Sequence, residues 1–272
     1  MKKFLTKSAI AAGVVLSAAI ASRPAMASSL FQVTIEDPNT QQSTLYTNPN
    51  AYGATGVYEE TFDSQKTGYN QNGMAFDGNS NIGTYNQTDI VGANLYGGAG
   101  GTGNYITVQP GKDGTPSGYQ TTLTLANPER YFGIDWTAGD AYNELDFYSG
   151  NTLLQKFTTA DVINYLKAQP SGETPYQGNP NNRSLDTSEP FAFLNFFADP
   201  NNSNVTFNKV VFINNSSGTG FESDNHTIAA SYTSTSGKTI ISSTPEPSVA
   251  MGLGIIAGIG MLLQNRRLLK KA

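Results

Sequence analysis

Short runs of alternating apolar and polar residues fill the middle of this chain, and they restrict its fold more than any other feature. Phe31, Val33 and Ile35 alternate in one run, and the same period recurs over 132–136, 145–147 and further along the chain. Successive side chains of a β-strand point to opposite faces of a sheet, so each run predicts a half-buried strand. Clusters of Gly, Asn and Pro between the runs predict turns. The predicted fold class is all-β, a single antiparallel β-sandwich of jelly-roll type with one short helix.

Four local features of this segment are also predicted. Residues 137–141 have hairpin-turn chemistry between two of the strands. The strand around Val210 carries apolar residues on both faces, which predicts burial on both sides. A helix is expected over 158–166, where a threonine can cap the first turn and Asp161 interacts favourably with the helix dipole. Residues 169–190 are rich in Pro and Gly and predict a long surface loop.

Cysteine is absent from the 272 residues, and histidine occurs once, at position 226. A disulfide, a thiol nucleophile, a thiolate zinc site and a multi-histidine transition-metal site are therefore excluded. His226 is predicted to be structural, because no serine lies in a recognisable nucleophile motif. Gly98–Gly103 fits the G-x-G-x-x-G pattern, but a strand-like sequence follows it where a dinucleotide site needs a helix. We expect a loop there and no catalytic residues, so the chain is not predicted to be an enzyme.

The first 27 residues predict a signal peptide. Three lysines precede an apolar stretch, and small residues, Ala25 and Ala27, follow it. A basic start, an apolar centre and small residues before the cleavage point are the three parts of a secretory signal. We expect signal peptidase to cleave after Ala27, so that the mature chain starts at Ser28 and is exported across the inner membrane.

The C-terminal 28 residues predict a single membrane helix with a basic tail. A Pro-Glu-Pro tripeptide is followed by an uncharged run over 249–263 and then by Arg266, Arg267 and two lysines. Helix of this length spans about 22 Å, short of the roughly 30 Å hydrocarbon core, and flanking residues can make up part of the difference. The positive-inside rule places the basic tail in the cytoplasm and the rest of the mature chain outside.

A Pro-Glu-Pro tripeptide, a short apolar helix and a terminal arginine cluster resemble the PEP-CTERM sorting signal of Gram-negative bacteria. The resemblance covers residues 245–272, at the extreme C-terminus and behind a signal peptide. It implies that Pro245, Glu246 and Pro247 are recognised by exosortase, an integral-membrane protease that removes the tail. Signal peptidase and exosortase are thus the expected processing partners, and the chain is expected to be anchored in the membrane only until processing. A plain single-span anchor is the alternative.

The segment between the two ends resembles the same kind of protein. Tyr131–Trp136, Glu144–Gly150 and Gly220–His226 are similar to segments of exosortase-dependent surface proteins of cyanobacteria. That resemblance implies an exported β-rich domain on the outer surface or outside the cell, and it supplies no catalytic residues.

These assignments divide the chain into four parts. We predict a signal peptide over 1–27, a β-sandwich over 28–230, a Ser/Thr-rich spacer over 231–244 and the sorting signal over 245–272. Half of the 16 basic residues lie in the two ends, so the segment 28–244 has 8 basic and 20 acidic residues and a net charge of −12. A segment this acidic is not expected to bind nucleic acid.

One group of residues is a candidate for a glycan-binding surface. Asp135, Trp136, Tyr142 and Glu144 lie close together in the sequence. Sugars stack on the faces of aromatic rings, and carboxylates accept hydrogen bonds from sugar hydroxyls. The alternative for the carboxylates is the solvated outer face of a sheet.

Calcium is the one cofactor that the composition favours, because it takes carboxylate, amide and backbone oxygens as ligands. Asp77, Asn79 and Asn81 have the spacing with which a calcium loop begins, although the rest of the segment lacks the glycine and glutamate of an EF-hand. Two looser loop sites are alternatives, at Asp199 with Asn201 and at Glu222 with Asp224.

Together these observations predict an exported surface or extracellular-matrix protein with a structural or adhesive role. The first alternative is a carbohydrate-binding module, lectin-like and calcium-assisted, with extracellular polysaccharide as its partner. The second is an extracellular glycoside hydrolase, which needs two carboxylates converging in a cleft.

Overall fold

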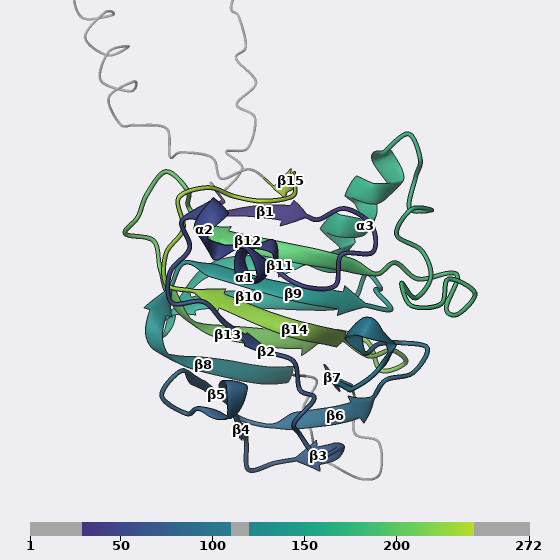
Figure 1. Ribbon diagram of the computed structural model, residues 1–272, viewed down its shortest axis with the longest axis horizontal. Coiled ribbons are helices and arrows are strands. Elements are labelled where there is room, and N and C mark those ends of the chain that lie inside the picture. The colour runs from purple at the N-terminus through teal and green to yellow at the C-terminus, as the bar shows by residue number, and fades with distance from the viewer. Residues whose placement is uncertain (1–28, 110–119, 242–272) are drawn as a thin grey trace, which may run out of the picture.

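A computed structural model describes residues 29–109 and 120–241 of the protein (Figure 1). Two antiparallel β-sheets pack face to face as a sandwich, which confirms the predicted all-β class. Within the described ranges, no helix is both long and apolar enough to cross a membrane. The predicted signal peptide and sorting signal lie outside the described residues, and with them the cleavage and sorting residues Ala25, Ala27, Pro245, Glu246, Pro247, Arg266 and Arg267.

The larger sheet has nine strands. They are β1 (Phe31–Ile35), β2 (Tyr58–Glu60), β3 (Gly68–Asn70), β6 (Thr88–Gly92), β7 (Asn104–Thr107), β9 (Tyr131–Thr137), β12 (Ala192–Ala198), β14 (Glu222–Ala229) and β15 (Lys238–Ile241). Their order is β15-β1-β12-β9-β14-β7-β6-β3, and β2 pairs with another part of β14. Most neighbours in this sheet are distant in sequence, so long-range pairing holds it together.

The smaller sheet has six strands. They are β4 (Met74–Ala75), β5 (Gly83–Tyr85), β8 (Gln120–Glu129), β10 (Asn143–Ser149), β11 (Thr152–Thr158) and β13 (Phe207–Asn214). Their order is β11-β10-β13-β8-β5-β4. All the pairings are antiparallel.

Five short helices complete the described structure. They are α1 (Thr44–Thr47), α2 (Pro49–Tyr52), the 3-10 helices η1 (Phe76–Gly78) and η2 (Ala99–Gly101), and α3 (Thr159–Ala168). α3 confirms the predicted helix and buries Val162 and Leu166. α1 and α2 were not predicted, because helices of four residues show no periodicity. Leu45 of α1 packs on Tyr131 and Phe197, which places these helices on the outer face of the larger sheet.

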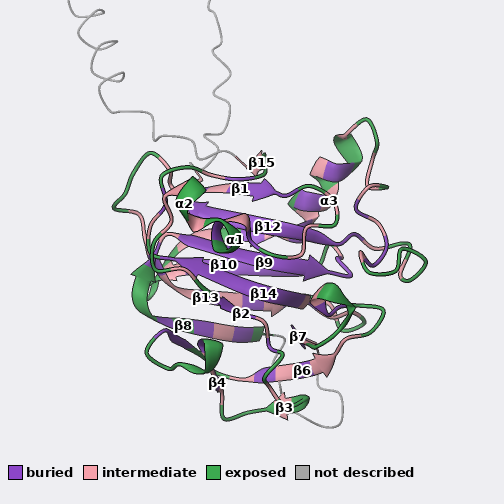
Figure 2. Cartoon of the chain, in the orientation of Figure 1, coloured by how far each residue is buried: buried purple, intermediate pink, exposed green. Residues whose placement is uncertain are grey.

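The main core lies between the two sheets and is rich in phenylalanine. Figure 2 shows buried residues along β9, β12 and β14 of the larger sheet and β10 of the smaller one. Phe147 of β10 meets Phe196 of β12 across the interface, with ring centroids 5.1 Å apart, and meets Phe132 of β9 at 6.0 Å. Burial of rings of this size supplies most of the hydrophobic stabilisation of such a sandwich.

The turn over residues 137–141 is not a hairpin, contrary to the prediction. β9 belongs to the larger sheet and β10 to the smaller one, so this turn carries the chain from one sheet to the other. The backbone N–H of Gly139 donates to the carbonyl of Pro190 at 2.8 Å and fixes the turn against a distant loop. Local composition predicts a turn, but tertiary contacts decide which strand the next segment pairs with.

The strand β13 is buried on one face only, where we expected burial on both. Val210 and Phe212 face the core, while Val211 and Ile213 are half-buried on the other face. A bulge between Phe207 and Lys209 shifts the register and turns Phe207 into the core as well.

Most of the predicted spacer belongs to the sandwich. Tyr232 is buried, and its hydroxyl donates to the carbonyl of Ala198 at 2.8 Å. Lys238–Ile241 forms the edge strand β15 and pairs with β1. The Ser- and Thr-rich composition gives no sign of this packing, because one buried tyrosine and backbone pairing are enough to hold the stretch on the sandwich.

Candidate functional site

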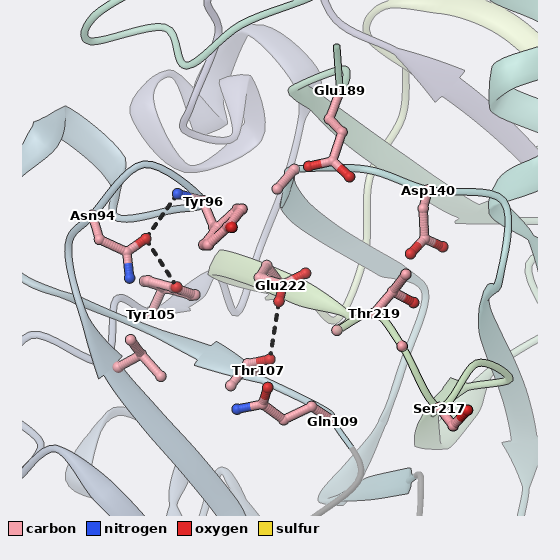
Figure 3. Close-up of a pocket in the computed structure, with 14 residues that line it drawn as sticks. Asn94, Tyr96, Tyr105, Thr107, Gln109, Asp140, Glu189, Ser217, Thr219 and Glu222 are labelled. Atoms are coloured by element: carbon pink, nitrogen blue, oxygen red, sulfur yellow. Dashed lines mark hydrogen bonds between the residues drawn. The ribbon is translucent and has the colours of Figure 1, made fainter. Parts of the chain in front are cut away.

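A polar hollow of about 420 Å³ lies where β7 and β14 run side by side on the larger sheet (Figure 3). We call it the acidic hollow. Its lining residues are Val91, Asn94, Tyr96, Tyr105, Thr107, Gln109, Ala138, Asp140, Glu189, Ser217, Gly218, Thr219, Gly220 and Glu222. They come from three strands and from five loops that are far apart in the sequence.

Glu222 lies at the centre of the hollow. It is the first residue of β14, and because Phe221 packs into the main core, Glu222 points to the outer face. Its Oε1 atom accepts a hydrogen bond of 3.2 Å from the hydroxyl of Thr107 on β7. Figure 3 shows Tyr105, Thr107 and Gln109 on one side of it and Asp140 and Glu189 on the other.

Two tyrosines and one asparagine form a wall of the hollow. The side-chain oxygen of Asn94 accepts from the backbone N–H of Tyr96 at 2.7 Å and from the hydroxyl of Tyr105 at 3.2 Å. Tyr105 is buried, whereas Tyr96 is 46% exposed. The ring of Tyr96 is therefore available to a ligand, and its backbone is held in place by Asn94.

Three carboxyl groups line the hollow, and two of them have strongly shifted pKa values. Burial raises the pKa of Glu222 to about 7. Burial, together with the hydrogen bond and charge of Asp186, raises the pKa of Glu189 to about 8. Asp140 is the third. Near neutral pH Glu222 and Glu189 can both donate and accept hydrogen bonds, as a hydroxyl-rich ligand requires.

The hydroxyl of Thr219 is also directed to this region (Figure 3). Its oxygen is buried and makes no hydrogen bond within the described part of the protein. Buried polar atoms without a partner are uncommon in folded proteins.

The four predicted glycan-binding residues do not form one surface. Trp136 is fully buried in the main core, and its indole N–H donates to the side chain of Asn143 at 3.1 Å. Asp135 is buried on the opposite face of β9. Glu144 belongs to the other sheet and accepts a 2.6 Å hydrogen bond from Lys156. Only Tyr142 of the four is exposed, at 55%. The expectation of an exposed tryptophan was therefore wrong. Alternation along the strand predicts that Trp136 lies on one face of the sheet but not which face, and in the structure this face packs in the core.

The predicted calcium loop is exposed. Asp77 belongs to η1, and its backbone N–H donates to Glu60 at 2.7 Å. The side-chain oxygen of Asn79 accepts from the backbone N–H of Asn81 at 3.0 Å, so it closes a turn. Among the residues that the structure describes, no group of three or more Asp, Glu or His side chains is arranged to hold a metal ion.

His226 lies in the main core, fully buried. Its Nδ1 atom is 2.8 Å from the hydroxyl of Tyr85, and its Nε2 atom is 2.9 Å from the hydroxyl of Ser223. Its ring stacks on that of Phe212, with centroids 4.9 Å apart. Burial lowers the pKa of His226 to about 3, so the imidazole is neutral. These contacts describe a structural histidine.

The residues of the acidic hollow were missed by the sequence analysis, apart from Glu222, which appeared in an alternative calcium site. Tyr96, Asp140 and Glu189 lie in three separate loops, and no spacing in the sequence relates them. The Gly98–Gly103 segment leads into the strand β7, as predicted, although it contains the short 3-10 helix η2. Comparisons with protein-family models and with curated proteins find no match for this chain.

Proposed function

We propose that this chain is an exported, exosortase-processed surface or extracellular-matrix protein whose jelly-roll-type sandwich has a structural or adhesive role. The signal-peptide pattern over 1–27 and the PEP-CTERM pattern over 245–272 support the location. The C-terminal helix holds the chain at the inner membrane until exosortase acts, and the processed protein stays on the outer surface or outside the cell.

The acidic hollow supports a second candidate function, in which the protein adheres by binding a carbohydrate. The observation that carries it is the convergence of carboxyl groups, amides, hydroxyls and the exposed ring of Tyr96 in one hollow, without a Lys, Arg or His among the lining residues. Sugars offer hydroxyls to such groups and C–H faces to aromatic rings. The proposed partner is therefore an extracellular polysaccharide.

Binding can be tested on the full chain with extracellular polysaccharide as the probe. Tyr96→Ala and Glu222→Gln should each weaken retention about tenfold, which corresponds to roughly 1.4 kcal/mol. Tyr142→Ala is the matched control, because Tyr142 is also exposed, at 55% against 46% for Tyr96, but does not line the hollow. Equal retention of all three variants and the unchanged protein would count against a glycan site in the hollow.

The same assay separates binding from hydrolysis. Carboxyl groups with raised pKa values beside other carboxylates are also found in glycoside hydrolases. We expect no new reducing ends when the protein is incubated with the polysaccharide. Their release, and its loss in Glu222→Gln, would contradict the proposed non-enzymatic role.

The location has an independent test. Expression of the chain with and without an exosortase, followed by mass measurement, should show a shorter protein only where the enzyme is present. A tail that stays intact in both cells would contradict processing at Pro245–Pro247.

A further inference from the structure

Two buried carboxylates face each other on the outer side of the larger sheet, beside the acidic hollow but outside it. Asp135 of β9 and Asp224 of β14 are directly paired in the sheet register. Paired positions on one face bring their Cβ atoms to about 4.5–5.5 Å. Asp135 is 1% exposed and Asp224 is 2% exposed.

The two carboxylates differ in their hydrogen bonds. Asp224 accepts from the backbone N–H of Ala99 at 2.8 Å and from that of Asn225 at 2.7 Å. Neither oxygen of Asp135 has a partner in hydrogen-bonding geometry. Burial and the charge of Asp224 raise the pKa of Asp135 well above its ordinary value, and the nearby amide of Gln41 offsets only part of this rise. An unpartnered carboxylate this deeply buried is costly for the folded state.

The surrounding charges increase this cost. The ion pairs in the described part of the chain are Lys156–Glu144, Lys167–Glu173 and Lys238–Asp37, and all of them lie elsewhere. Negative charge comes instead from Glu59 and Asp63, which act on Asp224. Two buried carboxylates in a negative environment need either a shared proton or a cation.

A route from solvent reaches Asp224, while Asp135 lies behind it and does not line the opening. An opening of about 340 Å³ is lined by Asp224 and, among others, by Gln41, Asp63 and Asn225. The amide oxygen of Gln41 accepts a weak 3.3 Å hydrogen bond from the backbone N–H of Gly100 and can turn to a cation. All the donor atoms available here are oxygens, which is the ligand chemistry of calcium and not of the softer transition metals.

We propose that Asp135 and Asp224 bind a calcium ion, with the amide oxygen of Gln41 and water molecules completing the coordination. The ion fastens the glycine-rich loop around Ala99 and the segment around Gln41 to the larger sheet. This site is distinct from the loop predicted at Asp77, and it does not depend on carbohydrate binding.

Calcium alone is the probe for a first test on the full chain in mild detergent, after treatment with chelator. At pH 7.5, 5 mM CaCl₂ should raise Tm by about 3–8 °C relative to NaCl of equal ionic strength. Asp135→Asn should abolish this shift and should also raise Tm in the presence of chelator, because it removes a carboxyl group that is costly to bury beside Asp224 whether it is ionised or has to take up a proton. A merely structural aspartate would lower Tm instead. An unchanged Tm with calcium would overturn the proposal and favour a shared proton.

Two control variants locate the ion. Asp77→Asn alters the predicted loop, and Glu222→Gln alters the acidic hollow; both should retain the full calcium shift. Loss of the shift in either, with retention in Asp135→Asn, would overturn the assignment to Asp135 and Asp224. Terbium luminescence gives a second measurement that does not depend on unfolding: calcium should displace Tb³⁺ from the unchanged protein, and Asp135→Asn and Asp224→Asn should each reduce the bound Tb³⁺ signal by at least half.

Discussion

At the scale of single residues, His226 shows how a polar side chain is accommodated in an aromatic core. Phe212 stacks on its ring, and Phe62 and Phe132 meet its edge. Each ring nitrogen has a hydroxyl partner, from Tyr85 or Ser223. A neutral imidazole has one donor and one acceptor nitrogen, and hydroxyls can serve either, so both tautomers are satisfied. The side chain therefore links β5 and β14, which belong to different sheets.

Replacing His226 with Ala should lower the free energy of unfolding by about 3–4 kcal/mol. The variant leaves a cavity beside Phe212 and leaves two buried hydroxyls without partners. Tyr85→Phe removes one hydroxyl and should cost about 1–2 kcal/mol. Urea unfolding measures both, and equal midpoints for the two variants would show that the histidine ring contributes little to packing.

At the scale of elements, the edge strand β15 depends on the turn before it. Gly237 has a φ of 75°, and a Cβ there would lie 2.7 Å from the carbonyl oxygen of Ile35. Only glycine fits this close approach with a positive φ. Beside it, the hydroxyl of Thr34 donates to the carbonyl of Ser236 at 2.6 Å. The turn and β1 thus fix the register of β15.

Gly237→Ala should reduce the free energy of unfolding by about 2–3 kcal/mol, because the steric conflict adds to the cost of a positive φ. Gly150→Ala is the matched control: its φ is 59°, and a Cβ there meets no atom within 4 Å. It should cost about 1 kcal/mol. Thermal unfolding compares the two, and an equal loss of Tm would mean that β15 moves away from β1 without consequence.

At the scale of the whole molecule, excess negative charge dominates. The segment 28–244 has 20 acidic and 8 basic residues. Several carboxyl groups are buried without a cation, and burial raises the pKa of Glu129 to about 7. A buried charge without a partner opposes folding, whereas the protonated group does not. Stability should therefore depend on pH well above the usual range for carboxylates.

When the pH falls from 8.5 to 6.5, the free energy of unfolding should rise by about 1–2 kcal/mol. This figure includes a reduction for Glu189, because solvent screens a partly exposed carboxyl group. Glu129 and Glu189, with folded pKa values of about 7 and 8, take up protons in the folded state before the unfolded chain does. His226 acts in the opposite direction, mainly below pH 6.5, because the unfolded chain is half protonated at this residue at pH 6.5 while the folded chain is not.

Urea unfolding with chelator present measures this pH dependence. Glu129→Gln cannot titrate, so the rise in this variant should be smaller by about 0.5–1 kcal/mol. A stability that falls between pH 8.5 and pH 6.5 would contradict the assignment of raised pKa values.

Much of the fold could be predicted because strand burial leaves a local pattern. Phe31, Val33 and Ile35 alternate and form β1, and the helix after Thr158 has the expected apolar face. The expected threonine cap is not formed, because the Thr158 hydroxyl donates to Asp161 at 3.0 Å and does not accept from a backbone N–H. The wrong predictions of the fold concern strand pairing, which the local pattern of apolar and polar residues does not specify. Nothing between Trp136 and Leu145 indicates that the chain changes sheets, and the bulge near Phe207 has no sequence signature.

The candidate sites were predicted far less well. Tyr96, Asp140 and Glu189 meet Glu222 of β14 because five loops gather over β7 and β14. Asp135 and Asp224 are 89 positions apart, and only the register of β9 and β14 brings them together. The sequence by itself determined the β-sheet character and the acidic charge, since these depend on composition and short-range order, and it is the basis of the signals predicted at the two ends. The tertiary structure alone decided which carboxylates lose water and face one another, because burial and strand pairing are properties of the folded chain.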